Sequence, residues 1–569
     1  MKEEIRAFIY ITAISNAIDF EGKANPRALL GRVIPKFPEL KSDMNSLLSN
    51  INSIVDEVNN MSLDEQKKEF SKLGKDIIQT KTPKKEKDGL PNLANTQDGV
   101  VVRFPPAPSG YLHLGHLVGI VANYEFKKKY GGKFILRFED TNPDNIKLEN
   151  YQKVIDDVMW VCEGDVDEIC YQSDRIDLYY KYLRELFEKK QCYVCNCTSE
   201  DFKKLTDAKE ECPHRKLSFS EQKNLFEEFM KGEIEGVVRA KAEINNSNPA
   251  LRSFALARIN KTPHPRVGNK YKVWPNYNLA VTVDDYLMEL THVIRGKDLE
   301  IGELRQKYLA KSLGWEMPIY FHFGRLNFID VELSKTKLSE KIEEGIFTGW
   351  DDPRVPSLIS HRKRGYKPQA FRKLILKQGI SKRDSKITKD EYYKALDFFN
   401  KEILEEESNR AFCVKDPVIL EIENYEEIPF KTFEMLKHPN KEENGKRQFN
   451  VEKHYMIEQE DFDKLEEKDT FRLMHFANFE IITKTKDKML VKYLSREYDK
   501  SMKLKSNIHF VSKNSEQIIL ILPNNTKVKA LCEKLGNLKE DTSLQFERYA
   551  FVKFDRIEEN KKVFYYTHR

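Results

Sequence analysis

The pattern of apolar and polar residues changes along the chain and predicts blocks of different structure. Residues 1 to about 80 carry apolar residues at helical spacing, and Asn25 followed by Pro26 is typical of a helix start. From residue 100, strand-like runs at 100–104 and 133–138 flank a helical run at 117–130, which predicts a βαβ unit. Beyond about residue 411, short alternating runs separated by turns predict β-barrels.

We therefore expect a multi-domain protein centred on an α/β domain of Rossmann type. Along the chain we expect a helical N-terminal extension with a charged linker, followed by the first half of the sheet domain. An insertion, where strands and helices stop alternating, then separates this half from the second half of the sheet domain. A helical and basic segment and all-β barrels complete the chain. These blocks are residues 1–98, 99–191, 192–275, 276–345, 346–410 and 411–569. Strands of the last block are expected at 479–483, 516–522, 545–554 and 562–566.

Composition narrows the classes of function. Of the 569 residues, 33% are charged, and the mean hydropathy is −0.64. No run of about 18 apolar residues occurs, and Met1-Lys-Glu-Glu-Ile5 lacks the apolar core of a signal peptide. We therefore expect a cytoplasmic protein with no membrane partner. The net charge of +5 is much milder than a purely electrostatic nucleic-acid binder would show, and it fits a protein that holds RNA on local basic faces. No DNA partner is expected.

Two separate motifs carry the chemistry. The run Arg103-Phe-Pro-Pro-Ala-Pro-Ser-Gly-Tyr-Leu-His-Leu-Gly-His116 lies between an expected strand and an expected helix. Amides and the positive dipole end at such a turn hold phosphate, and Gly115 lets a nucleotide approach the backbone. Far downstream, Leu333-Ser-Lys-Thr-Lys337 supplies a cationic loop that can close over the same phosphates. Together the two motifs indicate nucleotide binding.

These motifs resemble the His-Ile-Gly-His and Lys-Met-Ser-Lys-Ser signatures of class I aminoacyl-tRNA synthetases. The sequence of the first motif is similar to the corresponding motif of the glutamyl/glutaminyl subgroup. The resemblance extends over nearly the whole chain, including Gly349-Trp-Asp-Asp-Pro-Arg354 and the ending Tyr566-Thr-His-Arg569. The β-rich C-terminal block resembles the archaeal glutamyl type, because bacterial glutamyl enzymes end in helical anticodon domains. The resemblance implies that the insertion binds the acceptor stem of tRNA and that the barrels bind the anticodon.

The reaction implied is activation of L-glutamate by ATP and Mg²⁺ to glutamyl-adenylate, followed by transfer to the 3′ end of tRNA(Glu). Charging of tRNA(Gln) as well is left open. In this family tRNA is normally needed before activation proceeds. Two alternatives are a glutaminyl-tRNA synthetase, which position 295 distinguishes, and a catalytically inactive tRNA-binding paralogue. Intact His113, His116, Ser334 and Lys335 weigh against the inactive paralogue.

The substrate carboxylate attacks ATP itself, so the protein must align reactants and stabilise charge on the phosphates. The resemblance implies catalytic roles for His113, His116, Ser334 and Lys335. It implies an ATP site formed by Ala107, Pro108, His113, Gly115, His116, Gly119, Gly296, Arg325, Leu326, Leu333, Ser334 and Lys335. Glu332 departs from the fuller signature, which has lysine there, and leaves Lys335 as the principal cation of the loop.

The glutamate pocket is implied to contain Arg103, Ser109, Glu139, Tyr277 and Arg295. By resemblance Glu139 accepts the α-ammonium and Tyr277 lines the side-chain pocket, next to Asn278 where relatives usually have Asp. Arg103 ends an apolar strand and is either paired structurally or aimed at an anion; the resemblance places it on the substrate carboxylate. Glutaminyl enzymes have a small uncharged residue at position 295, whereas the planar fork of arginine suits a γ-carboxylate.

The alternative for Arg295 is a structural pair with Asp298 or Asp285.

In the insertion, Cys195-Asn-Cys197, a 14-residue gap and Cys212-Pro-His214 form a Cys₃His set that suits tetrahedral zinc. The alternative is a group of reduced thiols, and Cys192 is a substitute ligand. For RNA, we expect phosphate contacts from residues 361–364 and stacking from Tyr549, Tyr565 and Tyr566.

Overall fold

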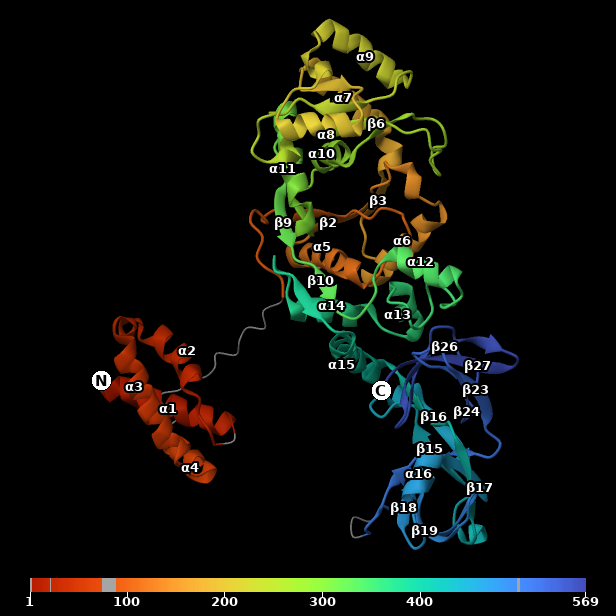
Figure 1. Cartoon of the computed structure of the whole chain (residues 1–569). Coiled ribbons are helices and arrows are strands. Elements are labelled where there is room, and N and C mark those ends of the chain that lie inside the picture. The colour runs from red at the N-terminus through yellow and green to blue at the C-terminus, as the bar shows by residue number, and fades with distance from the viewer. Residues whose placement is uncertain (1–2, 21, 74–88, 499–501) are drawn as a thin grey trace. The chain divides into compact units, whose positions relative to one another are not determined.

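A parallel sheet near the middle of the chain positions the site. The structure, a computed structural model, describes residues 3–20, 22–73, 89–498 and 502–569. It divides into two units, Met1–Lys87 and Asp88–Arg569. Helices of the first unit are α1 (Glu3–Asp19), α2 (Pro26–Lys36), α3 (Met44–Asn59) and α4 (Leu63–Leu73) (Figure 1). The Asn25 side chain accepts a hydrogen bond from the backbone N–H of Arg27, with Pro26 at the first helical position, so the predicted helix start is confirmed.

The sheet of the second unit has β1 (Val100–Phe104), β2 (Gly132–Phe138) and β3 (Glu168–Tyr171) in parallel. The strand β8 (His292–Gly296) lies beside β1 and pairs in parallel with β9 (Ile319–Phe323). Thr291 donates from its backbone to Val101 and Arg103 donates to the carbonyl of Ile294, so β1 and β8 run in the same direction. The helix α5 (Leu117–Tyr130) packs on β1, β2 and β8. The carboxyl ends of these strands therefore meet at one edge, where such sheets bind ligands. The predicted βαβ unit is confirmed.

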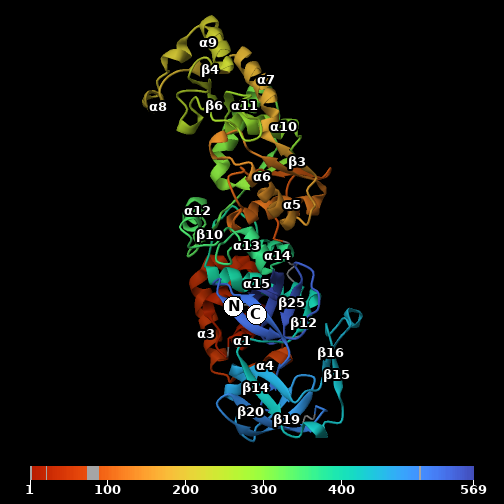
Figure 2. The same ribbon diagram turned by 90° about the vertical axis from the view of Figure 1, so that its right-hand side faces the viewer.

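An antiparallel sheet interrupts this alternation. It contains β4 (Cys192–Cys195), β5 (Val237–Ala240), β6 (Ala255–Ile259) and β7 (Val273–Pro275), in that order, with helices α8 (Ser199–Ala208) and α9 (Phe219–Lys231) between β4 and β5 (Figure 2). The flanking helices are α6 (Glu149–Val161), α7 (Ile176–Glu188), α10 (Tyr277–Leu287) and α11 (Glu300–Leu313). Because α7 and α10 contact each other, the chain leaves and re-enters the parallel sheet domain at neighbouring points.

A mixed segment follows β9. It contains β10 (Leu326–Phe328), α12 (Lys335–Glu343), α13 (Leu358–Arg364), α14 (Pro368–Gln378), β11 (Ser385–Ile387) and α15 (Lys389–Glu407), and β10 pairs in parallel with β11. The segment predicted to be helical at 346–410 contains α13, α14 and α15, whereas residues 346–357 form turns and extended backbone and residues 385–387 form β11. Proline and glycine interrupt helical structure in residues 346–357. The strand β11 forms because β10, distant in sequence, provides its hydrogen-bond partners.

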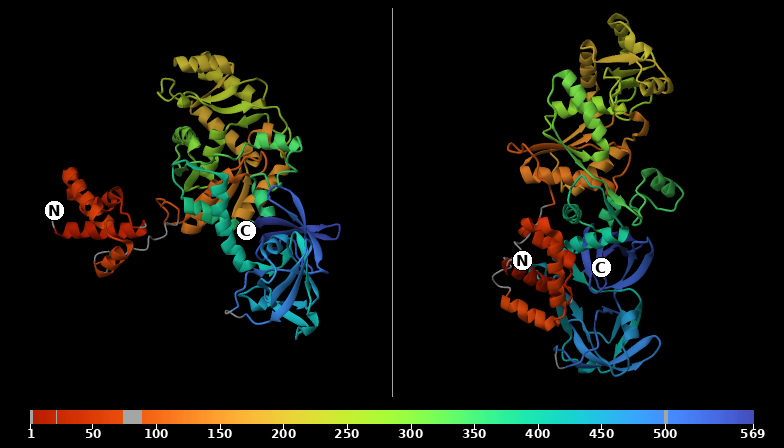
Figure 3. Two further views of the ribbon diagram at one scale, coloured as in Figure 1. Left: turned by 60° about the horizontal axis from the view of Figure 1, so that its bottom comes forward. Right: turned by 60° about the vertical axis from the view of Figure 1, so that its left-hand side comes forward.

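Two seven-stranded sheets form the C-terminal region (Figure 3). One has the order β21-β18-β19-β20-β14-β17-β22 and the other β12-β25-β26-β27-β23-β24-β13. The edge strands β12 (Asn409–Ala411) and β13 (Cys413–Val414) are separated only by Phe412, and β21 (Asn507–Ile508) and β22 (Val511–Ser512) only by two residues. A sheet whose two edges are joined so closely curls on itself, so the predicted barrels are confirmed.

The other strands of these barrels are β14 (Pro417–Ile422), β17 (His454–Glu458), β18 (Thr470–Leu473), β19 (Ala477–Lys484), β20 (Lys488–Ser495), β23 (Glu516–Ile521), β24 (Lys527–Cys532), β25 (Ser543–Phe546), β26 (Ala550–Glu558) and β27 (Lys561–His568). A hairpin of β15 (Thr432–Leu436) and β16 (Lys446–Asn450) and the helix α16 (Gln459–Lys464) complete the region. The single strand expected at 545–554 is wrong, because Arg548 has a φ of 66° in a turn between β25 and β26. Within the described residues, no helix combines the length and apolar character that crossing a membrane requires.

Candidate active site

The two predicted histidines form a self-contained turn at the start of α5. The Nδ1 atom of His113 accepts from the backbone N–H of Gly115 at 3.1 Å, and the Nδ1 atom of His116 accepts from the backbone N–H of His113 at 3.2 Å. A ring nitrogen that accepts a hydrogen bond carries no proton, so each neutral imidazole has its proton on Nε2. Both rings can therefore donate from Nε2, and their centroids lie 4.0 Å apart.

Burial keeps these imidazoles neutral. Burial, with a smaller contribution from Lys335, lowers the pKa of His113 to about 4, and burial together with His113 lowers the pKa of His116 well below its usual value. The turn therefore offers hydrogen-bond donors whose state does not change near pH 7. A Cβ at Gly115 would lie 2.9 Å from His113 Cε1, so glycine also leaves room for the His113 ring to fold back on its own backbone.

The Ser-Lys loop lies over this turn. Lys335 begins α12, and its Nζ donates to Ser109 Oγ at 3.3 Å. Burial lowers the pKa of Lys335, while the carboxylate of Asp157 opposes that shift. Glu332, where the fuller signature has lysine, accepts from the backbone N–H of Ser334 at 3.0 Å and pairs with Lys337 at 2.9 Å. The acidic residue thus binds Lys337 and leaves Lys335 directed at the signature turn.

The other predicted ATP residues surround the ends of β1 and β8. Gly119 lies against Phe104, where an added Cβ would be 3.3 Å from the ring, and the Leu333 side chain lies close to Gly115. The guanidinium of Arg325 pairs with Asp298 at 3.1 Å, although the Arg325 side chain is mostly exposed. Ala107, Pro108, Gly296 and Leu326 lie in the same loops and strand ends. The structure therefore brings the two distant motifs together.

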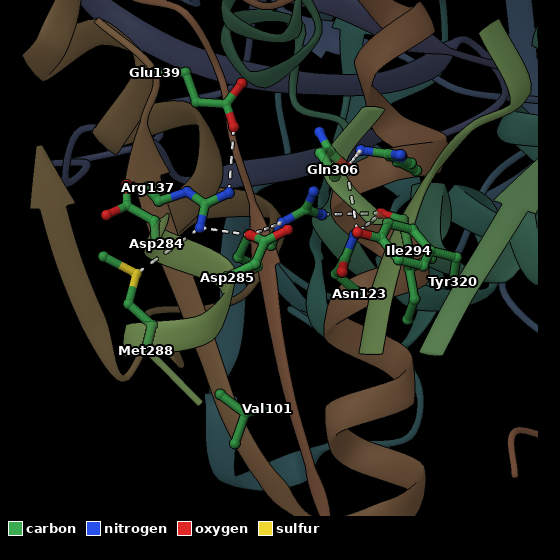
Figure 4. Close-up of polar contacts among 12 residues, drawn as sticks. Val101, Asn123, Arg137, Glu139, Asp284, Asp285, Met288, Ile294, Gln306 and Tyr320 are labelled. Carbon is green, nitrogen blue, oxygen red and sulfur yellow. Dashed lines mark hydrogen bonds and ion pairs between the residues drawn. The ribbon is translucent and has the colours of Figure 1, made fainter. Parts of the chain in front are cut away.

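Three arginines each occupy the penultimate position of a strand: Arg103 in β1, Arg137 in β2 and Arg295 in β8. Arg103 and Arg137 are fully buried and share Asp285, at 3.7 Å and 2.7 Å. Figure 4 shows Arg137 between Asp285 and Glu139, the latter at 3.3 Å. Burial lowers the pKa of Arg103 and would lower that of Arg137, but Asp285, Asp284 and Glu139 raise the pKa of Arg137 overall.

Arg295 is held differently. Its Nη1 donates to Gln306 Oε1 at 3.0 Å and to the Tyr277 hydroxyl at 3.4 Å, and its Nε lies 3.4 Å from His322 Nε2. Burial raises the pKa of Tyr277 to about 12, so this phenol is neutral. The alternative pairing of Arg295 with Asp298 or Asp285 is wrong, since Asp298 pairs with Arg325 and Asp285 with the other two arginines.

The charges of this cluster do not balance. Arg103, Arg137 and Arg295 contribute three positive charges, whereas their ion-pair partners Asp285 and Glu139 contribute two negative charges. The nearby Asp284 is paired with Arg175, so this second pair adds no net charge. Burial raises the pKa of Glu139, and Arg137 and Arg103 oppose that rise. Among the described residues, Nη2 of Arg103 and Nη2 of Arg295 are buried without a hydrogen-bond partner. A buried group with unpaired donors and excess positive charge favours an anionic ligand.

Sequence comparisons agree with this geometry. Residues 99–406 match the family described as tRNA synthetases class I (E and Q), catalytic domain, and residues 408–499 match the anti-codon binding domain of the same group. Glutamate–tRNA ligases of Methanocaldococcus jannaschii and Pyrococcus furiosus are each 39% identical to this chain, over 561 and 571 residues. The alignments cover 98% of this chain and 99% and 98% of the relatives. The chain belongs to this family.

The protein is therefore a class I synthetase, an aminoacyl-tRNA ligase with an anticodon-binding domain. A solved glutamate tRNA ligase of Elizabethkingia meningosepticum in complex with its amino acid is 22% identical, with a TM-score of 0.40 over 55% of this chain and 70% of that one.

Two residues of this synthetase's site, Arg137 and Gln306, had no predicted role, and Asp285 was predicted only as an alternative partner of Arg295. Arg137 occupies the same penultimate strand position as Arg103, and this position in the sequence could have indicated that Arg137 belongs to the site. Asp285 and Gln306 lie on helices α10 and α11, where sequence alone does not reveal that they face the arginines of distant strands.

The cysteine cluster of the insertion is closely gathered. The ligand atoms of Cys195, Cys197, Cys212 and His214 all lie within 4.8 Å of one another. The sulfur atoms of Cys195 and Cys212 are 3.8 Å apart, and the sulfur of Cys197 is 3.4 Å from His214 Nδ1. Cys192, the substitute ligand, instead directs its sulfur at the carbonyl of Leu183.

The prediction for RNA contacts is wrong for part of the basic run 361–364. His361 and Arg364 are buried, and Arg364 donates to the carbonyl of Thr567 at 3.0 Å, which attaches α13 to β27 of the barrel. Tyr565 is also buried, at 6% exposure, and cannot stack on a base in this conformation. Tyr549 and Tyr566 are half-buried and keep accessible surface.

Proposed function

We propose that this synthetase ligates L-glutamate to tRNA(Glu), through glutamyl-adenylate formed from glutamate and ATP. The observation that carries the proposal is Arg295, a buried cation at the end of β8 whose Nη2 has no partner among the described residues. Glutamate brings one more negative charge than glutamine, and the arginine cluster has one positive charge in excess. A planar guanidinium also pairs a carboxylate better than a carboxamide, which brings N–H groups of its own.

The chain's residues act by alignment and charge stabilisation. The Nε2–H groups of His113 and His116 donate to phosphate oxygens of ATP at the start of α5, and Lys335 approaches the same phosphates from α12. Magnesium bound with ATP offsets part of the phosphate charge. Glu139 receives the α-ammonium of glutamate, while Ser109 and Tyr277 border the amino acid. The glutamate carboxylate attacks the α-phosphate, so the protein needs no nucleophile of its own.

Charging assays test this function. Purified tRNA(Glu) and tRNA(Gln) are each offered glutamate and glutamine with ATP. Glutamate on tRNA(Glu) is the expected product, and glutamate on tRNA(Gln) as well would place the protein among synthetases that charge both. Glutamine on tRNA(Gln) alone would make it a glutaminyl enzyme. No product and no ATP–pyrophosphate exchange with tRNA present would make it an inactive paralogue.

Replacing Lys335 by alanine should lower kcat for ATP–pyrophosphate exchange by at least about tenfold, with little change in KM for ATP. An interaction made only in the transition state is lost from kcat. The matched control is Lys337→Ala, whose side chain is 64% exposed and pairs with Glu332, and it should stay within about twofold of the native enzyme. An unchanged kcat in Lys335→Ala would remove Lys335 from the mechanism.

The insertion is proposed to hold structural zinc. Two sulfur ligands about 2.3 Å from a tetrahedral zinc ion lie about 3.8 Å apart. The sulfur atoms of Cys195 and Cys212 have this separation, 3.8 Å. Gln222 donates to the carbonyl of His214 at 2.7 Å and fixes this ligand's backbone. Zinc would then hold β4 and the loop before α9 together, at the part of the insertion that approaches the tRNA acceptor end.

Metal analysis after mild washing with a chelator should find about one zinc per chain. Cys212→Ser should lose the metal, because three ligands hold zinc weakly. Cys192→Ser, which alters a buried thiol outside the cluster, should keep it. A zinc-free native protein with full activity would show that these thiols are merely buried.

A further inference from the structure

Arg295 differs from the other two arginines of the site in the charge of its partners. Arg103 and Arg137 share the carboxylate of Asp285. The contacts of Arg295 among the described residues are the amide of Gln306, the hydroxyl of Tyr277, the imidazole of His322 and the ring of Tyr320, 4.9 Å from the guanidinium carbon. Burial and Arg295 lower the pKa of His322, while Glu303, 3.5 Å from His322 Nδ1, opposes that shift. The four groups that contact Arg295 directly are therefore neutral.

Gln306 is the firmest of these contacts. It lies fully buried on α11, and its Oε1 accepts from Arg295 at 3.0 Å and from the Tyr320 hydroxyl at 3.2 Å (Figure 4). Guanidinium groups donate only, so the amide oxygen must face Arg295. With Tyr320 holding the same oxygen, the amide cannot turn without losing two bonds. The glutamine therefore fixes one edge of the guanidinium, and the other edge, Nη2, stays unpaired.

We infer that Gln306 is a positioning residue for amino-acid specificity: it holds Arg295 with a neutral acceptor, so that the charge of Arg295 is left for the γ-carboxylate of the substrate. The inference rests on the proposed glutamate-ligase function and deepens it. A carboxylate at position 306 would hold Arg295 at the same place, but it would neutralise the guanidinium. A glutamate side chain in the substrate would then meet a second carboxylate where it now meets a cation.

Gln306→Glu provides the test, since the two side chains have almost the same shape. Wild-type charging of tRNA(Glu) with glutamate is measured first, which establishes the function independently of Gln306. In the variant we expect kcat/KM for glutamate to fall about 30-fold or more, because two charges about 4 Å apart interact strongly in a partly desolvated site. The kcat/KM for glutamine should stay within about threefold or rise, since its carboxamide is neutral and gains an acceptor.

A second variant separates position from charge. Gln306→Met conserves volume and removes the hydrogen-bond acceptor without adding charge. The guanidinium of Arg295 therefore keeps its positive charge but is no longer held in one orientation. We expect KM for glutamate to rise about fivefold or more, with a smaller change in kcat and in the glutamate-to-glutamine ratio than in Gln306→Glu. This variant also tests the inference if Gln306→Glu does not fold.

Gln172→Glu is the matched control. Gln172 is buried in the same domain, but it donates to Asp284 at 3.0 Å and contacts none of the pocket arginines among the described residues. The Gln172→Glu variant should have a lower Tm and a kcat/KM reduced by the same factor for glutamate and glutamine. If Gln306→Glu leaves the ratio of the two kcat/KM values unchanged, or Gln306→Met leaves KM for glutamate unchanged, Gln306 supports the fold only and the inference is overturned.

Discussion

Replacing Arg295 by cysteine should reduce kcat/KM for glutamate by about 30-fold or more in aminoacylation at fixed tRNA. Removing one partner of a buried charge pair commonly costs about 2–5 kcal/mol, partly because the other charge is left unpaired. Here that charge is the substrate's γ-carboxylate, which would face Tyr277, Gln306 and His322 without a cation among them. Glutamine should lose far less, because its amide never depended on the charge of Arg295.

The loss of kcat/KM for glutamine in Arg295→Cys shows whether Arg295 recognises the side chain of the amino acid or supports the fold. Arg103 still biases the pocket toward an anion, so full conversion to a glutamine enzyme is not expected. Arg305→Cys is a matched control, since Arg305 lies on α11 and donates to the carbonyl of Ala250, outside the pocket. It should leave the glutamate-to-glutamine ratio unchanged. Equal loss for both amino acids in Arg295→Cys would mean that Arg295 does not read the side chain.

Much of this site could be predicted because its chemistry lies at strand ends. Arg103 and Arg295 each follow an apolar strand run, and polar residues at such positions face the ligand edge of a parallel sheet. The cysteine cluster was similarly visible from spacing, because short-range spacing constrains where thiols lie after a turn. The local pattern places these residues, whereas the roles of Arg103 and Arg295 toward glutamate were implied by the resemblance to the glutamyl/glutaminyl subgroup.

Pairing across distant elements could not be predicted in the same way. Asp285 lies on α10 and joins arginines from β1 and β2, which are more than a hundred residues away in sequence. Asp284 and Asp285 are adjacent in sequence, yet Asp284 binds Arg175, Gln172 and Tyr179 instead. Which neighbour faces which cation depends on the helix rotation that packing sets.

Burial of charged residues could not be predicted from the sequence either. The run 361–364 has the composition of a solvated basic face, but α13 packs on β26 and β27 and buries two of its four members. Arg364 is accommodated because its guanidinium donates to Thr567 and stacks on Tyr366 and Tyr393. Charge in a sequence therefore indicated a surface that tertiary packing had covered.

Replacing Asp285 by asparagine should lower the free energy of unfolding of the sheet domain by about 3–5 kcal/mol, because it leaves Arg103 and Arg137 buried with one carboxylate fewer. Asparagine keeps the shape of the side chain, so the loss reports charge. Urea unfolding followed by tryptophan fluorescence measures it, since all four tryptophans lie between residues 160 and 350. Glu227→Gln, which breaks a surface pair with Arg184, should change the same quantity by less than about 1 kcal/mol.

A double variant separates the charge pair from other effects of the substitution. Arg137→Gln removes one of the two stranded cations, so adding it to Asp285→Asn should recover part of the lost stability. The two single losses should then exceed the loss of the double variant by about 0.5–3 kcal/mol, as expected for residues in contact. Strictly additive losses would show that Asp285 does not hold Arg137. In that case Glu139 alone compensates Arg137, and Asp285 compensates only Arg103.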